Sequence, residues 1–147
     1  MKQLLMKSFV VVALAIPALL NAQNLKGLNI IMTSPDAQTQ MMGMVLATMT
    51  LKKHQKEVTI TLCGPAGALA VKGEKSALVK RPGGAKAVSP KMALKGLIKA
   101  GAHVALCPLY LPNAGKDASV LLPGITIAKP PLVAKKLINA DYNNISF

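Results

Sequence analysis

Apolar and polar segments alternate along the chain in a pattern that predicts a sheet covered by helices. Short runs rich in β-branched and other apolar residues are typical of strands, and they lie at 28–33, 58–63, 103–107, 124–128 and 143–147. Helical runs lie between them, at about 39–56, 66–71, 89–100 and 130–140. Strands that alternate with helices indicate one three-layer α/β/α domain with a mostly parallel sheet of five strands.

Two of the expected helices are amphipathic. The helix that begins at Ser89 has Pro90 in its first turn, where a residue without an N–H is tolerated. Lysines recur on one of its faces, and its apolar residues lie toward another: Ala93, Leu94, Leu97 and Ile98. In the last helix, we expect Val133, Leu137 and Ile138 to face the core. The segment 72–88 has glycine, proline and charge without a sustained period and predicts an exposed loop. The segment 111–122 can hold a helical turn or none.

The first residues have the parts of a secretory signal. Lys2 and Lys7 precede or border an apolar run of about 12 residues, and a cleavage site follows at 20–22. The run is too short to cross a bilayer, which requires roughly 20 apolar residues. We therefore expect a signal peptide at 1–22 and one domain at 23–147, in a periplasmic or secreted protein with no membrane span after cleavage.

The chain is strongly basic, with a formal net charge of +13 at pH 7. Such an excess attracts nucleic acid, anionic membranes or anionic ligands. Binding to nucleic acid usually adds arginine forks and stacking aromatic residues. This chain has one arginine, Arg81, no tryptophan, two tyrosines and two phenylalanines. The composition argues against nucleic acid and favours anionic small molecules or an acidic partner.

The two cysteines, Cys63 and Cys107, both stand at the end of an expected strand. Ligands and reactive groups gather at the carboxyl ends of parallel strands. In an exported protein, a pair of cysteines is by default a disulfide, which requires Cα atoms within roughly 7 Å. The bond is possible if the second and third strands are neighbours. It is impossible if the first strand lies between them, because second-neighbour strands are about 10 Å apart.

Four stretches resemble the DsrE/DsrF-like family of sulfur-carrier proteins in their order and spacing. They are LNIIMTSPD, VTITLCGPAGALAVKG, LIKAGAHVALCPLYLPNAG and LLPGITIAKPPLVAKKLINADYNNISF. The resemblance implies a flavodoxin-like strand order 2-1-3-4-5, which separates the two cysteines. It also implies a homo-oligomer, either a trimer or a hexamer, and a loop cysteine that carries sulfur as a persulfide. By position, that cysteine is Cys107.

The chain departs from the family pattern at two positions of this loop. Tyr110 stands where many members have a second cysteine, and Ala114 stands where many have a basic residue before the glycine, here Gly115. A mechanism with two cysteines in the loop is therefore unsupported. Positive charge to stabilise a thiolate has to come from elsewhere, for example from Lys116.

We expect no metal and no cofactor. His103 lies about 13 Å along the strand from Cys107, and His54 is at the polar end of a helix, whereas a zinc site requires four close ligands. Methionine is a soft copper ligand, and four methionines crowd the first long helix. Burial by the sheet and by a neighbouring subunit explains them better. They are Met41, Met42, Met44 and Met49.

Three functions remain open at this point. The first is an exported sulfur relay or sulfurtransferase, with Cys107 as the persulfide carrier and with a sulfur donor or acceptor as its partner. The second is a non-catalytic oligomeric binding module of the same fold, with an inert cysteine and a basic surface for an anion or a partner. The third is a structural protein stabilised by a Cys63–Cys107 disulfide.

Overall fold

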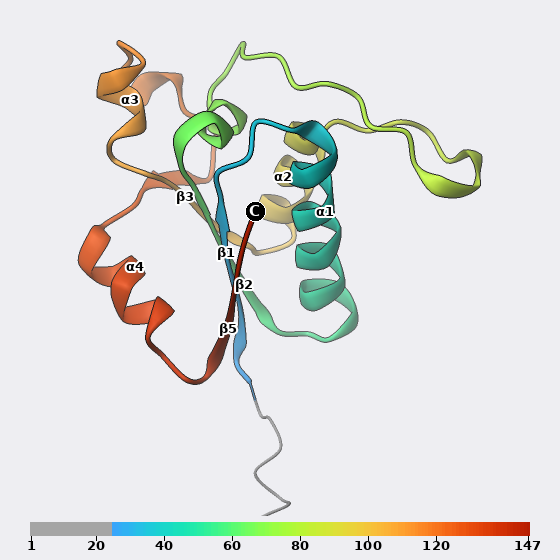
Figure 1. Cartoon of the computed structure of the whole chain (residues 1–147), viewed down its shortest axis with the longest axis horizontal. Coiled ribbons are helices and arrows are strands. Elements are labelled where there is room, and N and C mark those ends of the chain that lie inside the picture. Colours follow the sequence, from blue (N-terminus) through green and yellow to red (C-terminus); the bar gives the residue numbers. More distant parts are fainter. Residues whose placement is uncertain (1–24) are drawn as a thin grey trace, which may run out of the picture.

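The computed structural model describes residues 25–147, which form a parallel sheet of five strands in the order β4-β3-β2-β1-β5. Helices cover both faces of this sheet (Figure 1). The expected α/β class with three layers and a five-stranded parallel sheet is therefore confirmed. The expected signal peptide at 1–22 lies outside the described residues. Within the described part of the chain, no helix has the length and apolar character needed to cross a membrane.

The strands are close to their expected positions. Their bounds are β1 Gly27–Met32, β2 Glu57–Leu62, β3 His103–Leu106, β4 Ile125–Ile127 and β5 Tyr142–Ser146. The α-helices are α1 Ala37–Thr48, α2 Pro90–Lys99, α3 Tyr110–Asn113 and α4 Pro130–Leu137. A π-helical turn, Met49–Lys53, continues α1, and a 3-10 helix, Gly64–Ala70, follows β2. Shorter 3-10 turns are Pro82–Gly84 and Ala118–Val120. The segment 111–122 thus holds helical turns.

The hydrophobic core lies between one face of the sheet and the helices α1 and α2. Side chains alternate along a strand, and one set, which includes Ile30, Ile60 and Leu106, is almost completely buried there. From α2, Leu94 and Leu97 complete this layer, as the periodicity predicted. Each fully buried aliphatic side chain of this kind contributes about 1.5–3 kcal/mol of transfer free energy.

The opposite face of the sheet is more polar and carries α4. Asn29, which is buried in β1, donates hydrogen bonds from Nδ2 to the Lys136 carbonyl oxygen and to Asn144 Oδ1. The Lys136 ammonium donates to Thr59 Oγ1 at 2.6 Å. The expectation that Ile138 faces the core is wrong, because it follows the end of α4 and is 85% exposed. This layer is joined to the sheet largely by polar contacts.

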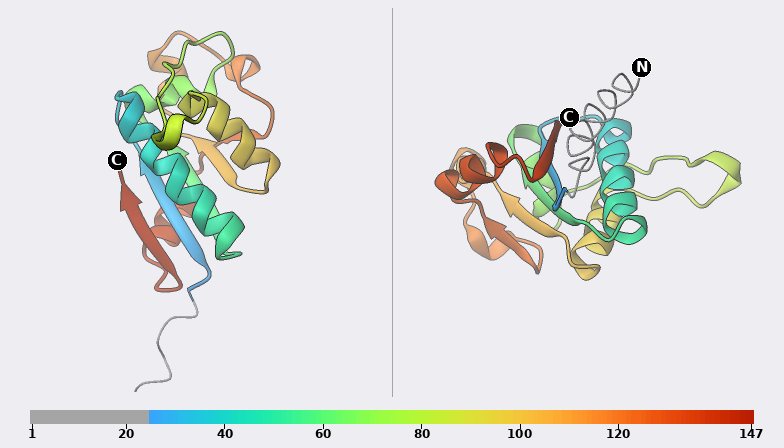
Figure 2. Two further views of the ribbon diagram at one scale, coloured as in Figure 1. Left: turned by 90° about the vertical axis from the view of Figure 1, so that its right-hand side faces the viewer. Right: turned by 90° about the horizontal axis from the view of Figure 1, so that it is seen from below.

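The expected strand order 2-1-3-4-5 is not the order of this sheet, since β2 lies between β1 and β3. The reason is the placement of the first two helices. Crossovers between parallel strands are right-handed, so α1 and α2 on the same face move the chain in the same direction from β1 through β2 to β3. Only α4, on the other face, returns the chain across the sheet and places β5 beside β1 (Figure 2).

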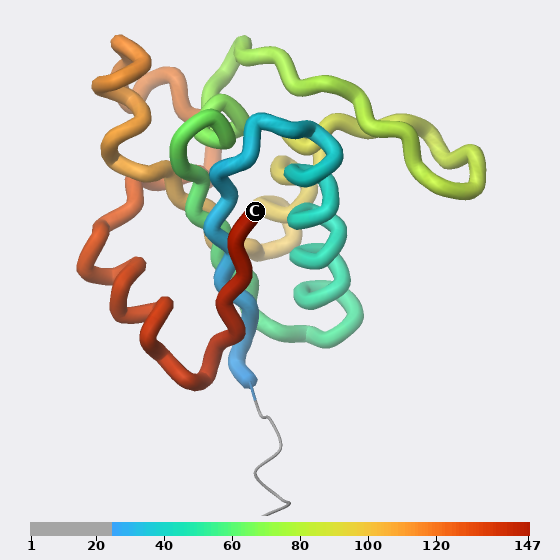
Figure 3. Tube along the Cα trace, in the orientation of Figure 1, coloured from blue at the N-terminus to red at the C-terminus, as the bar shows by residue number. Residues whose placement is uncertain are grey.

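The segment 72–88 extends away from the body of the domain as a long loop, in agreement with the sequence (Figure 3). A bridge between Val79 and Val88 closes its tip, and most of its residues are exposed. The Lys91 ammonium donates hydrogen bonds to the carbonyl oxygens of Val71 and Glu74 and so anchors the start of the loop to α2.

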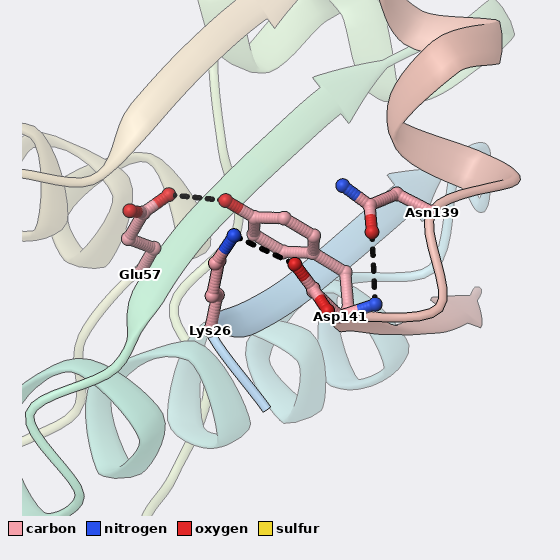
Figure 4. A network of polar contacts seen from close by, with 5 residues as sticks. Lys26, Glu57, Asn139 and Asp141 are labelled. Atoms are coloured by element: carbon pink, nitrogen blue, oxygen red, sulfur yellow. Dashed lines mark hydrogen bonds and ion pairs between the residues drawn. The ribbon is translucent and has the colours of Figure 1, made fainter. Parts of the chain in front are cut away.

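A small polar network joins β1, β2 and β5 at the amino ends of the strands (Figure 4). The Lys26 ammonium lies 2.6 Å from Asp141 Oδ2, and this contact raises the pKa of Lys26. The Tyr142 hydroxyl donates to Glu57 Oε2 at 2.7 Å, and the Asp141 N–H donates to Asn139 Oδ1 at 2.9 Å. Exposed pairs of this kind contribute little to stability, so the network orders a strand edge remote from the cysteines.

Candidate functional site: a thiol pair at the carboxyl edge of the sheet

Cys107 is the residue directly after β3, at the carboxyl edge of the sheet. Its N–H donates to the Leu62 carbonyl oxygen at 2.8 Å, which continues the ladder between β2 and β3 by one residue. Its own carbonyl oxygen accepts from the Tyr110 N–H, so the chain turns at once into α3. Cys107 is half-buried and lines a cavity of about 490 Å³. Its sulfur is therefore not enclosed by the core.

Cys63 lies directly after β2 and lines the same cavity. The register pairs Leu62 with Leu106, so the next residues along the two strands are Cys63 and Cys107. Both thiols are free. The expectation that an intervening strand holds them apart is wrong, because β2 and β3 are neighbours.

The pKa of Cys63 is raised to about 11. Burial is the main cause, because it disfavours the charged thiolate. The second cause is the negative charge of Cys107 when that thiol ionises, and the third is a hydrogen bond between the two thiols. At neutral pH, Cys63 is therefore a protonated thiol on the same cavity as Cys107.

The cavity lies between the segments that follow β2 and β3. Its lining is mainly small or apolar: Cys63, Gly64, Pro65, Cys107, Leu109, Tyr110, Asn113 and Ala114. Leu109, at 68% exposure, is at the rim. A positive φ of 50° at Gly64 turns the chain away from the sheet immediately after Cys63, and only glycine adopts this conformation without strain.

Tyr110 forms one wall by packing on Gly67 of the 3-10 helix. A Cβ atom at position 67 would lie 2.2 Å from Tyr110 Cδ2, so the close approach requires glycine. Burial, and secondarily the charge of Glu74, raise the pKa of Tyr110 and keep its hydroxyl protonated. Tyr110 therefore joins the segments that follow β2 and β3.

No lysine or arginine is present among the described residues that line the cavity. Lys116, which the sequence suggested as a source of positive charge, has its ammonium 3.5 Å from Glu74 Oε1 instead. A role of Lys116 in stabilising a thiolate at Cys107 therefore stays a prediction, because the ammonium contacts Glu74.

The remaining candidates lie elsewhere. His54 and His103 are both exposed, and the residues described contain no group of three His, Cys, Asp or Glu side chains that could hold a metal. Of the methionines in the first helix, Met41 and Met44 are buried in the core, whereas Met42 and Met49 are exposed.

Comparison with known proteins shows the fold alone. The ychN protein from E. coli matches with a TM-score of 0.63 at 17% sequence identity, and the match covers 82% of this chain and 99% of that chain. A protein of unknown function from Methanobacterium thermoautotrophicum, MTH1491, matches with a TM-score of 0.58 at 11% identity, over 82% of this chain and 97% of that chain. No protein-family model and no curated protein sequence matches the chain.

Proposed function

We propose that this protein is a sulfur-relay protein of the DsrE type, in which Cys107 carries sulfur as a persulfide. The observation that supports the proposal is a free, half-buried cysteine at the carboxyl end of a parallel strand, facing a cavity of about 490 Å³. The cavity is larger than one sulfur atom requires, so a small donor can approach the thiol. The likeness in fold to ychN and MTH1491 is compatible with this proposal.

Loading is a nucleophilic displacement at sulfur. The Cys107 thiolate attacks the sulfane sulfur of a donor such as thiosulfate, the S–S bond of the donor breaks, and sulfite leaves with the electron pair. The product is a persulfide anion on Cys107. Thiosulfate and polysulfides are anions, and the basic excess, which is still +11 without Lys2 and Lys7 (16 basic less 5 acidic residues), favours their approach.

We also propose that the protein is exported and forms a homo-oligomer. Export is inferred from the signal-like pattern at 1–22. The support for the oligomer is a group of exposed apolar side chains on α1 and the turn that follows it, which are Met42, Val45, Leu46 and Met49. Apolar groups of this kind on one helix are typical of contacts between subunits.

The test uses the chain without its signal peptide and a matched pair of variants, Cys63→Ser and Cys107→Ser. Each is incubated with thiosulfate or polysulfide, and its intact mass is measured. We expect the Cys63→Ser protein to gain the mass of one sulfur atom, which a reductant removes, and the Cys107→Ser protein to gain none. An unchanged mass of Cys63→Ser, together with a thiol that alkylates only after unfolding, would contradict the relay and favour the binding module.

A further inference from the structure

Cys63 is a second thiol that the proposed relay does not use, although it lies beside the first. The pairing of Leu62 with Leu106 places Cys63 and Cys107 opposite each other, and the hydrogen bond from the Cys107 N–H to the Leu62 carbonyl oxygen keeps the two chains at sheet spacing. Neighbouring strands are about 4.8 Å apart. Disulfides form across Cα separations of roughly 4.4–6.8 Å, so the backbones already have the required spacing.

The two side chains also lie on the same face of the sheet. Successive side chains along a strand alternate between faces, so Cys63 follows Thr61, and Cys107 follows Ala105, on the face that carries α4. Both residues line the one cavity, and the charge of an ionised Cys107 contributes to the raised pKa of Cys63, as expected of neighbouring side chains. The sulfur atoms can therefore approach each other without a change of strand register.

The surroundings give the two thiols different roles. A thiolate attacks a disulfide or a sulfane sulfur far faster than a thiol does, and while Cys107 is free, burial and the Cys107 charge keep the Cys63 thiol protonated. Cys63 therefore does not compete for the incoming donor. An adduct on Cys107 removes that charge, which makes the loss of the Cys63 proton easier at the resolving step. The Cys63 proton is available to a departing sulfur once Cys107 carries an adduct.

The cavity has room for such an adduct beside Cys63. Gly64 and Ala114 contribute little side-chain volume to its wall, and Gly64 has no atom within 4 Å of the place where a Cβ would lie. A group held on Cys107 thus stays next to the second thiol.

We infer that Cys63 is a resolving thiol: it displaces the group that thiol exchange leaves on Cys107 and closes a Cys63–Cys107 disulfide. The inference rests on the proposed function only in taking Cys107 as the thiol that reacts first. With a mixed disulfide, the Cys63 sulfur bonds to the Cys107 sulfur, the bond to the small thiol breaks, and that thiol leaves with the Cys63 proton. With a persulfide that no acceptor has unloaded, the same step releases hydrosulfide, whose proton comes from Cys63.

The experiment uses glutathione disulfide as a probe that is independent of sulfur transfer. Wild-type protein, Cys63→Ser and Cys107→Ser, each without the signal peptide, are reduced, freed of reductant and incubated with the probe at neutral pH. Intact mass and thiol alkylation are then followed over time. In wild-type protein we expect both thiols to be lost with a net change of two hydrogen atoms, and dithiothreitol to restore them.

The variants report the order of the two steps. We expect Cys63→Ser to accumulate a glutathione adduct on Cys107, at a level about tenfold or more above that in wild-type protein, because a thiol held nearby acts at an effective concentration in the millimolar range or above. We expect Cys107→Ser to react slowly. Equal adduct levels in wild-type protein and Cys63→Ser would overturn the inference, as would the absence of any reaction at Cys107.

A second arm separates this inference from the relay. With polysulfide, loading frees a shortened polysulfide or hydrosulfide from both proteins. Wild-type protein should then lose both thiols and release one hydrosulfide per chain more than Cys63→Ser, whereas Cys63→Ser should retain the added sulfur. If Cys63→Ser takes up no sulfur but the glutathione result holds, the relay fails and the resolving thiol stands. If wild-type protein keeps its persulfide as long as Cys63→Ser does, the relay stands and the resolving role is wrong.

Discussion

Replacing Gly67 by alanine tests whether the contact between Tyr110 and the 3-10 helix forms the cavity wall. The new Cβ would lie 2.2 Å from Tyr110 Cδ2. Carbon atoms in contact are separated by about 3.5–4.0 Å, so the ring has to move by at least about 1.3 Å. Overpacking of this kind costs about 1–3 kcal/mol. With a urea slope of about 2 kcal/mol per molar, a cost of this size lowers the unfolding midpoint by about 0.5–1.5 M.

The control is the same substitution in a Tyr110→Ala background. Gly67 does not have a positive φ, so alanine fits its backbone, and a compatible change of glycine to alanine stabilises by about 0.4–1 kcal/mol. Without the ring, Gly67→Ala should therefore be neutral or stabilising. The coupling free energy between the two positions should be about 1.5–4 kcal/mol.

Urea unfolding of the wild-type protein, both single variants and the double variant measures this cycle. If the two changes add to within about 0.5 kcal/mol, which is the scatter expected of independent sites, the ring does not occupy the space above Gly67. Tyr110 would then not form the cavity wall. Glutathione labelling of Cys107 in Gly67→Ala gives a second measurement, because displacement of the ring changes access to the thiol.

Three further predictions concern a helix cap, a carboxylate and the buried thiol. Ser89→Ala should lower the free energy of unfolding by about 1 kcal/mol, because Ser89 Oγ accepts a hydrogen bond from the Met92 N–H at 3.2 Å. Ser89→Thr keeps the acceptor and should lower the free energy of unfolding less. Equal losses for the two variants in a urea titration would refute the cap. Hydrogen bonds from Thr39, chiefly from its N–H, lower the pKa of Asp36. The stabilising contribution of Asp36 is therefore present above the ordinary carboxyl pKa and is lost as the pH falls through the lowered value. Asp36→Asn should make the free energy of unfolding depend less on pH in the acid range. An unchanged slope of that free energy against pH would contradict the role of Asp36. The rate of Cys63 alkylation, measured by peptide mapping, should become half-maximal near pH 11 in folded protein and at a lower pH in urea. Because the raised pKa favours the protonated thiol in the folded state, the free energy of unfolding should fall as the pH rises toward 11. Alkylation of folded protein that is half-maximal near the ordinary thiol pKa would contradict the burial of Cys63.

Local patterns predicted the elements of the fold well. The β-branched runs identified all five strands, and the Ser89 cap with Pro90 identified the start of α2. These features depend on neighbouring residues in the chain, which the sequence displays directly. The last helix was expected to extend to about Ala140, whereas α4 ends at Leu137, so Ile138 was assigned to the core although it lies beyond the last helical turn.

The candidate site could be predicted only in part. The position of Cys107 at a strand end followed from the hydrophobic pattern. The involvement of Tyr110 did not, because its ring packs on Gly67, which is far away in the sequence. The small-residue run around Gly67 was the one available signal, since a buried glycine in a helical turn often marks a close approach.

By itself, the sequence determined which segments are strands and helices and that each cysteine follows a strand, because hydrophobic period and capping are properties of adjacent residues. Which strands are neighbours was decided only in the tertiary structure. There, α1 and α2 pack side by side on the same face of the sheet, and right-handed crossovers then require β2 to lie between β1 and β3. That arrangement converts two separate cysteines into a thiol pair.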